Sequence, residues 1–496
     1  MKKILAVLLT LCFLLPMAVG CADQSENNPG TTESVPVSTP IAEDETSEKE
    51  LDIKIPDGTN YGGIDFNYLY DTRVTNDFVV AEVNGEAIND AIYNRNLSVE
   101  NRLGIKFNWI GKNGSWNVMD HTNAIESSVK SGLHEYDAIS GELAVLMIII
   151  TNGYLLNVYD MPYIDLSAPW WNDKAASTLT VNENCFLALG DSSLTSYKNT
   201  FCMFFNKKVT ADHNITGIYD MVNNNQWTLD QLVALSKDMY IDVNGDGISG
   251  LEDSFGFVSA YDNHMRNWMV ALNTPIIQID DSGLMEICFI NDRTISGFEK
   301  LYDLYHAPSS NFSDTTISSP DAKNVPTIFT ENRTLFMSGY LNTASLLRTT
   351  DCNFGIIPYP KYDEDQENYR TSVHNSVEMI CFPTTLTNAK DIEKSSIVSE
   401  ALAYEAWKSV SPLYCEIVLK YRNTTDYESA KMVELIMNSV LFDIGWCHST
   451  ALQNCGMVYE KCIKGNQKNI SVYWRGLSKS VQSSLNDLNK AYQSMQ

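Results

Sequence analysis

The chain has 496 residues, of which 44 % are hydrophobic, and its formal net charge at pH 7 is −27. A surface this acidic opposes binding of nucleic acid or of anionic lipid by the folded body. The length and the hydrophobic content are sufficient for two sizeable cores rather than one.

The first twenty residues have the features of a secretory signal peptide. Met1 is followed by two lysines, residues 4–15 are apolar, and small residues precede Cys21. The end of this segment resembles a bacterial lipoprotein signal, which implies cleavage after Gly20 and a diacylglyceryl thioether on Cys21. An ordinary cleaved signal with an incidental cysteine is the alternative. Because the apolar run is too short to span a bilayer, we expect a lipid anchor on the extracellular face of the cell membrane.

Residues 21–58 are rich in Asp, Glu, Ser, Thr, Asn and Pro and have almost no aromatic or long apolar residues. Such a composition does not bury enough surface to fold, so a disordered acidic tether is predicted here. The folded body is expected to run from about residue 59 to the end of the chain.

The chain has eleven cysteines, of which one would be removed with the signal and another, Cys21, would carry lipid. The remaining nine have no paired spacing, and most lie in apolar runs typical of small core residues. Export permits disulfides, but the spacing assigns none. A zinc site formed by Cys447, Cys455 and Cys462 near His448 is disfavoured, since the usual CxxC spacing is absent.

Helical and extended patterns alternate through the first half of the body. This alternation predicts an α/β fold with a parallel sheet. Residues 392–496 are mostly helical, with apolar residues at helical spacing. The predicted helices in the first half are residues 88–103, 123–131 and 143–150, and the predicted strands are residues 105–110, 136–140, 185–189 and 201–205.

Residues 242–253 have the spacing of an EF-hand calcium loop. Gly247 holds position six, where the chain turns sharply, and a water at Gly250 would fill position nine. A helix beginning after the N-cap Thr228 precedes the loop and a strand follows it, so we expect a structural Ca²⁺ that staples one lobe. An acidic surface turn is the alternative. The predicted ligands are the side chains of Asp242, Asn244, Asp246 and Asp253 and the carbonyl oxygen of Ile248.

Six short stretches in a fixed order carry a family resemblance. They are EYDAISG at 135–141, NGYLL at 152–156, FFNK at 204–207, WTLDQL at 227–232, FTENRTLFMSG at 329–339 and FGIIPYPK at 354–361. In this order the chain resembles the extracellular solute-binding proteins of ABC importers, in the sugar-binding family (family 1) that includes maltose-binding protein.

This resemblance implies the type II periplasmic-binding-protein fold, in which hinge strands join two α/β lobes and the ligand lies between them. Lobe 1 would comprise residues 59–200 with part of about 345–400, and lobe 2 would comprise residues 201–344 with the calcium loop. Residues 401–496 would complete the lobes. Ligand binding would favour the closed arrangement of the lobes, and no catalysis is required. The sequence also lacks HExxH, GxSxG, P-loop and GxGxxG motifs.

A sugar presents an apolar ring face and a rim of hydroxyl groups, so its site needs aromatic platforms beside hydrogen-bonding side chains. Candidates come from loops and strand ends in the pattern above. Each also has a structural alternative, such as an acid at a helix start, an indole in the core or a solvated loop. The candidate ligand-binding residues are Glu142, Trp170, Trp171, Asp191, Tyr197, Trp268, Tyr340, His374, Asn375 and Trp446.

We therefore expect a lipid-anchored, monomeric solute-binding protein without enzymatic activity. It would capture a carbohydrate, by preference an oligosaccharide, and deliver it to the permease subunits of an ABC transporter. Two alternatives remain open at this stage: an exported glycoside hydrolase that uses two carboxylates, and a cell-surface adhesion module.

Overall fold

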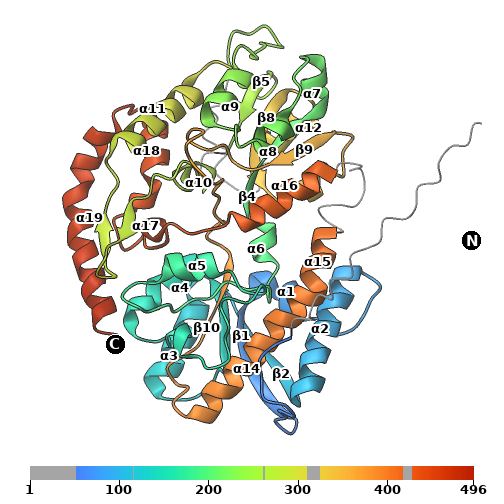
Figure 1. The fold of residues 1–496 in the computed structure, drawn as a ribbon, viewed down its shortest axis with the longest axis vertical. Helices are drawn as coiled ribbons and strands as arrows, with labels where there is room; N and C mark the ends of the chain where they lie inside the picture. Colours follow the sequence, from blue (N-terminus) through green and yellow to red (C-terminus); the bar gives the residue numbers. More distant parts are fainter. Residues whose placement is uncertain (1–51, 116, 261–262, 310–323, 417–426, 496) are drawn as a thin grey trace, which may run out of the picture. The chain divides into compact units, whose positions relative to one another are not determined.

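The computed structural model describes residues 52–115, 117–260, 263–309, 324–416 and 427–495 (Figure 1). The predicted signal peptide, the lipidation site Cys21 and nearly all of the predicted tether lie outside these residues. No helix in the described part of the chain is both long and apolar enough to cross a membrane.

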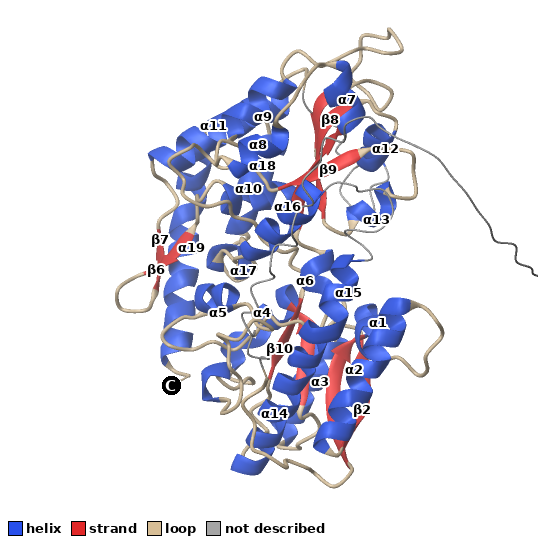
Figure 2. Cartoon of the chain, turned by 45° about the vertical axis from the view of Figure 1, so that its right-hand side comes forward, coloured by secondary structure: helices blue, strands red, loops and turns tan. Residues whose placement is uncertain are grey.

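Two four-stranded sheets form the framework, and helices surround both of them (Figure 2). In the first sheet the strand order is β10-β3-β1-β2. Strand β1 pairs parallel with β2 and β3, and β10 pairs antiparallel with β3. The strands are β1 (Ile64–Asp71), β2 (Ile105–Lys112), β3 (Ala138–Glu142) and β10 (Glu378–Cys381). We call this sheet and its helices lobe 1.

The second sheet, in lobe 2, has the order β5-β8-β4-β9. Strand β4 is antiparallel to both of its neighbours, and only β5 and β8 run parallel. The α/β class is thus confirmed, whereas the predicted parallel pairing holds for three strands of lobe 1 and for one pair in lobe 2. The strands are β4 (Phe201–Asn206), β5 (Phe255–Val258), β8 (Thr334–Tyr340) and β9 (Phe354–Ile357).

Residues of about 345–400 were expected to belong in part to lobe 1. Within this range β9 pairs with β4 in lobe 2, and β10 pairs with β3 in lobe 1. The buried backbone groups of β4 need partners on both edges, and β9 supplies the second edge.

Local sequence explains where the main helices begin and end. The Glu86 carboxylate accepts hydrogen bonds from two backbone N–H groups at the start of α2 (Ala87–Leu103), and Gly104 ends that helix in the left-handed conformation. At α9 (Leu229–Ser236), Thr228 accepts from the N–H of Gln231, which confirms the predicted N-cap. The strand predicted at residues 185–189 forms only an isolated bridge, between Ala188 and Ile380.

The remaining elements in chain order are α1 (Thr75–Phe78), α3 (Asp120–Ser131), α4 (Leu143–Ile149), α5 (Asp173–Leu179), α6 (Thr195–Lys198), α7 (Lys207–Asp212), α8 (Ile218–Asn223), α10 (Asn263–Ala271), β6 (Ile277–Ile279), β7 (Met285–Ile287), α11 (Asp292–His306), α12 (Asn324–Thr330), α13 (Thr343–Leu347), α14 (Ala389–Glu405), α15 (Ser411–Tyr414), α16 (Tyr427–Asn438), α17 (Ile444–Cys447), α18 (Val458–Lys464) and α19 (Ile470–Gln493).

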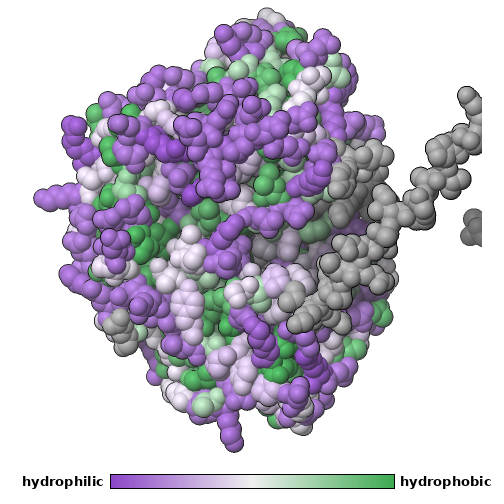
Figure 3. Space-filling model, in the orientation of Figure 1, coloured by the Kyte–Doolittle hydropathy of each residue, from purple (hydrophilic) through white to green (hydrophobic). Residues whose placement is uncertain are grey.

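The C-terminal helix α19 packs against both lobes. Near its start Trp474 contacts Phe289 of lobe 2, with ring centroids 4.8 Å apart, and near its end Tyr492 contacts Phe186, at 6.0 Å. Buried apolar side chains of the two lobes thereby form one continuous cluster. The surface shown in Figure 3 is mainly hydrophilic, as the composition predicts.

Candidate functional site

Two chain segments, residues 195–201 and 371–377, connect the lobes side by side. The Phe201 N–H donates to the carbonyl of Ser372 (3.1 Å), and the His374 N–H donates to the carbonyl of Asn199 (2.9 Å). We call this pair of segments the hinge.

A cavity lies beside the hinge, at the carboxyl end of β3 in lobe 1 and beside α10 of lobe 2. Leu143 and Ala144 directly follow β3 of lobe 1, and Arg266 belongs to α10, which follows β5 of lobe 2. In open α/β sheets this is where ligands bind. The space measures about 520 Å³ including the open solvent at its mouth, and its enclosed part is about 80 Å³. The interlobe cavity is lined by Leu143, Ala144, Arg266, Val373, Asn375, Phe442, Trp446, Cys447, Ser449, Thr450, Asn454 and Met457.

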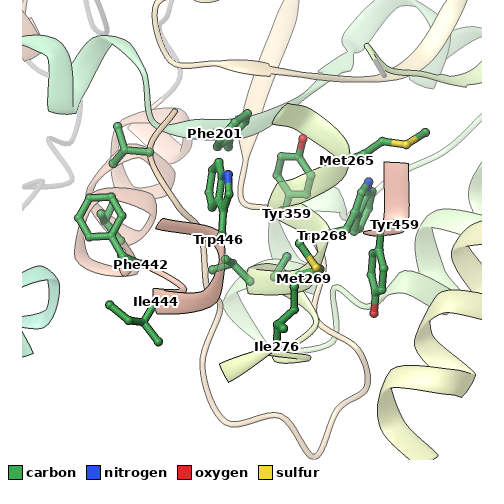
Figure 4. Close-up of a cluster of buried hydrophobic side chains, with 14 of the residues drawn as sticks. Phe201, Met265, Trp268, Met269, Ile276, Tyr359, Phe442, Ile444, Trp446 and Tyr459 are labelled. Atoms are coloured by element: carbon green, nitrogen blue, oxygen red, sulfur yellow. The ribbon is translucent and has the colours of Figure 1, made fainter. Parts of the chain in front are cut away.

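Trp446 is the largest aromatic side chain of the interlobe cavity. Asp443 caps the short helix α17 by accepting a hydrogen bond from the Trp446 N–H (2.7 Å), and the indole lies beside Phe201 (Figure 4). Burial raises the pKa of Asp443 to about 6. No described residue accepts a hydrogen bond from the indole N–H, so this group is available to a ligand. The side chain is only 5 % exposed, so a small part of the indole lines the cavity and its N–H is the polar group that it offers.

Asn375 supplies a second free polar group. Its backbone carbonyl accepts a hydrogen bond from the Ala144 N–H (3.0 Å), which ties the hinge to the start of α4. Its side-chain amide has no partner among the described residues. Asn375 and Trp446 are therefore the two sequence-predicted candidates that the fold brings together in the interlobe cavity.

Three other predicted residues, Trp171, Asp191 and Tyr197, line a different cavity of about 980 Å³. We call it the second cavity; its wall also includes Val373, which lines both. The Tyr197 hydroxyl donates to the Asp191 carboxylate (3.1 Å), and burial raises the pKa of Asp191 to about 7. The second cavity is formed by loops of lobe 1, by hinge residues that include Thr200 and by the end of α16.

The adjacent indoles of Trp170 and Trp171 share one acid. Both rings are buried, and their N–H groups donate to the two carboxylate oxygens of Glu400 on α14 (2.8 and 2.7 Å). Burial raises the pKa of Glu400 to about 7, although the two indole N–H groups oppose this shift. The arrangement gives both tryptophans a structural partner.

Because the pKa of Glu400 is raised on folding, the protein should lose stability as pH rises. Between about pH 4.5 and 7, Glu400 keeps its proton in the folded chain but loses it in the unfolded chain. The contribution of Glu400 to stability is therefore complete below pH 4.5 and is lost as pH rises to about 7. The difference in unfolding free energy between wild type and Glu400→Gln should fall by about 3 kcal/mol from pH 4.5 to 8. Urea denaturation across this range measures it. Glu393→Gln, an exposed position on the same helix, serves as the control, and a flat difference would contradict the assignment.

The other predicted residues lie around these cavities without lining them. Glu142 is buried and forms an ion pair with Arg73, which also pairs with Asp71. Tyr340 and His374 pack edge to face across the hinge, with ring centroids 5.6 Å apart. Glu142 directly precedes Leu143, which lines the interlobe cavity. The Glu142 carboxylate pairs with Arg73 of the same lobe.

Trp268 is fully buried in the core of lobe 2. Its indole N–H donates to the Tyr305 hydroxyl (3.0 Å), and its ring packs on Tyr359 (4.9 Å between centroids). Figure 4 shows both rings within the apolar cluster. This environment corresponds to the buried-helix alternative that the sequence left open for Trp268.

The predicted calcium loop folds around its own acidic side chains. Asp242 accepts from the N–H groups of Gly245 (2.8 Å) and Gly247 (2.9 Å), and both glycines have a positive φ, which the tight turn requires. Asp253 is buried and accepts from the Tyr240 hydroxyl and the Gly250 N–H. Carboxylate and amide oxygens are the donors that Ca²⁺ prefers. The described residues contain no group of three or more His, Cys, Asp or Glu side chains arranged to hold a metal, so calcium binding stays a prediction.

Several cavity residues were missed by sequence reasoning. Arg266 lies in the helix α10 that follows the strand expected after the calcium loop, and the rule that ligands bind beyond strand ends points to this region. Ser449, Thr450 and Asn454 lie in an irregular segment between α17 and α18 that has no recognisable pattern. Only the fold brings that segment to the cavity.

Comparison with known proteins identifies the fold. No protein-family model matches the chain, and a search of curated proteins finds no significant match. Solved structures do match. The cyclic α-maltosyl-1,6-maltose binding protein from Arthrobacter globiformis superposes with a TM-score of 0.57 at 13 % identity, covering 86 % of this chain and 100 % of that one.

Two further structures agree. The maltose-binding periplasmic protein MalE from Listeria monocytogenes, in complex with maltose, gives a TM-score of 0.54 at 10 % identity and covers 86 % of this chain and 98 % of its own. A family 1 extracellular solute-binding protein from Bifidobacterium longum subsp. infantis gives 0.53 at 11 %, with coverages of 86 % and 100 %. The chain thus has the two-lobed α/β fold of the MalE-type solute-binding proteins.

Proposed function

We propose that this protein is a lipid-anchored extracellular solute-binding protein that captures a carbohydrate in the interlobe cavity and delivers it to an ABC transporter permease. The observation that carries the proposal is the cavity itself. It lies between the carboxyl end of β3 in lobe 1 and α10 of lobe 2, and its wall combines Trp446 with Asn375, Arg266 and other polar groups. The structural neighbours named above support it, since two of them are named for the maltose-type sugars they bind.

The chemistry suits capture of a sugar. An indole packs on the apolar face of a sugar ring, and amide, hydroxyl and guanidinium groups bond to its hydroxyl rim. Because the wall combines residues of both lobes with the hinge, a ligand that contacts all three favours the closed arrangement. Described residues of the cavity wall include no Asp or Glu, so the carboxylate pair that glycoside hydrolysis uses is not part of it.

Calorimetry with the mature chain from residue 22, which omits the lipidated cysteine, tests the proposal. Neutral and acidic oligosaccharides are titrated, and the products are analysed by chromatography afterwards. Saturable binding at one site with the sugar recovered intact is the expected result. Sustained cleavage would assign a hydrolase instead, and the absence of binding by any oligosaccharide would reject carbohydrate capture.

We further propose that residues 242–253 bind a structural Ca²⁺. The support is the set of oxygen donors at EF-hand spacing and the turn that both glycines permit. The loop connects α9 to β5, so a bound ion would stabilise lobe 2 without contacting the carbohydrate.

Replacing Asp242 with alanine should remove the effect of calcium on stability. At calcium concentrations about 100-fold above the dissociation constant, wild type should gain about 2.7 kcal/mol of unfolding free energy over the chelated protein. Asp242→Ala should show the same stability in calcium and in chelator, with carbohydrate affinity little changed. Thermal and urea denaturation measure both states, and Asp280→Ala, a turn acid outside the loop, is the control. A wild-type protein that unfolds identically with and without calcium would reject the site.

A further inference from the structure

Arg266 gives the interlobe cavity a charge opposite to that of the whole chain. Of the twelve described residues on its wall, Arg266 alone carries a formal charge at neutral pH. The chain as a whole has a net charge of −27. A single cation on an otherwise neutral polar wall favours a ligand with a negative group.

The guanidinium of Arg266 is held rigidly from one side. Its Nε and one terminal nitrogen donate to Oε2 of Glu460 (3.2 and 3.0 Å), and the other terminal nitrogen donates to Oδ1 of Asn263 (2.6 Å). A guanidinium has five N–H groups, so these three bonds leave two N–H groups without a partner among the described residues. The side chain is only 15 % exposed, and it lines the interlobe cavity.

The Glu460 carboxylate does not neutralise this region. Lys464 also donates to Glu460, through Nζ to Oε1 (3.0 Å), so two cations share one buried carboxylate. The group of Arg266, Glu460 and Lys464 therefore has a net charge of about +1 at neutral pH. Two acids adjoin wall residues in the sequence: Glu142 pairs with Arg73, and Asp443 accepts the Trp446 N–H at the start of α17.

We propose that the ligand is an acidic oligosaccharide and that Arg266 binds the carboxylate of a uronate residue in it. This inference rests on the proposed function. The planar fork of a guanidinium matches the two oxygens of a carboxylate, and such charge-assisted pairs are stronger than neutral hydrogen bonds. Asn375 and Trp446 supply neutral donors on the same wall for the hydroxyl groups of the sugar.

The experiment compares matched ligands on the mature chain. Oligogalacturonates and oligomannuronates are titrated by calorimetry beside the same oligosaccharides after their carboxyl groups have been reduced to primary alcohols. Wild type should bind one acidic series at least about 10-fold more tightly than its reduced form. Arg266→Gln should weaken binding of that acidic series by about 10- to 100-fold and change binding of the reduced series by less than about threefold.

Two further variants separate recognition from folding. Arg266→Lys keeps the charge and a donor to Glu460 but loses the fork, so its loss of affinity for the acidic series should be intermediate. Arg102→Gln removes an equal charge from an exposed pair with Asp52 in lobe 1 and should leave the preference unchanged.

The outcomes separate this inference from the proposed function. Equal affinity of wild type for acidic and reduced sugars would overturn the inference and leave carbohydrate capture in place. Equal losses for both series in a folded Arg266→Gln protein would assign Arg266 a purely structural role and also overturn it. Tighter binding of sulfated than of uronate oligosaccharides would reject the carboxylate assignment. Failure of every sugar to bind would reject the proposed function itself.

Discussion

Trp268→Ala is expected to lower the free energy of unfolding by about 3 to 5 kcal/mol. The indole is fully buried, and its removal leaves a cavity between Tyr359 and Phe257. The change also removes the N–H that donates to the Tyr305 hydroxyl, within a chain of bonds that continues to Ser259. Urea denaturation of the two proteins measures the difference.

Trp268→Phe is the matched control for this change. It keeps most of the ring volume and loses only the N–H, so its cost should stay near the 1 to 3 kcal/mol of an unsatisfied buried polar group, or roughly half that of alanine. At ligand concentrations where both variants remain folded, carbohydrate affinity should be close to that of wild type. A Trp268→Ala protein that unfolds like wild type but no longer binds sugar would place Trp268 in the ligand site.

Trp446→Ala is expected to weaken carbohydrate binding by about 10- to 100-fold, because a large aromatic anchor at the centre of a site contributes about 1.4 to 2.8 kcal/mol to binding. Trp446 lines the interlobe cavity, where its indole N–H has no partner among the described residues. Calorimetry with the best oligosaccharide of the panel measures the change. Denaturation curves establish that the variant remains folded, since the ring also packs on Phe201.

A matched pair of conservative changes distinguishes the two cavities. Trp446→Phe and Trp171→Phe each remove one indole N–H and part of one ring, the first at the interlobe cavity and the second at the second cavity. We expect the affinity to fall for Trp446→Phe and to stay near wild type for Trp171→Phe. The opposite result would move the binding site to the second cavity, beside Asp191 and Tyr197.

Local sequence patterns predicted much of the scaffold. The apolar run that begins at Leu143 forms the buried helix α4, and the run at Phe201 forms the buried strand β4. The N-cap at Thr228 formed as predicted. These helices and strands could be predicted because periodicity and capping involve residues only a few positions apart in the chain. The order of short family-like stretches predicted the two-lobed fold.

The arrangement of the site could not be predicted from local sequence. Ten aromatic or polar side chains had the right chemistry for a sugar, but only Asn375 and Trp446 share the interlobe cavity. Trp268 has the same side chain as Trp446, yet it lies in the core, where it donates to Tyr305. Residue type specifies what a side chain can do, whereas its surroundings depend on packing between segments far apart in the chain.

The sequence by itself determined the class of fold, the main helices and strands and the acidic character of the surface. Each of these follows from composition or from spacing over a few residues. Only the tertiary structure decided which candidates meet, that Glu400 binds both adjacent indoles, and that Arg266 is the one charged residue described on the cavity wall. The physical reason is distance along the chain: Glu400 lies 230 residues from Trp170, and Glu460 lies 194 residues from Arg266. Contacts of this kind arise from the packing of the two lobes and the C-terminal helices, and no local pattern encodes them.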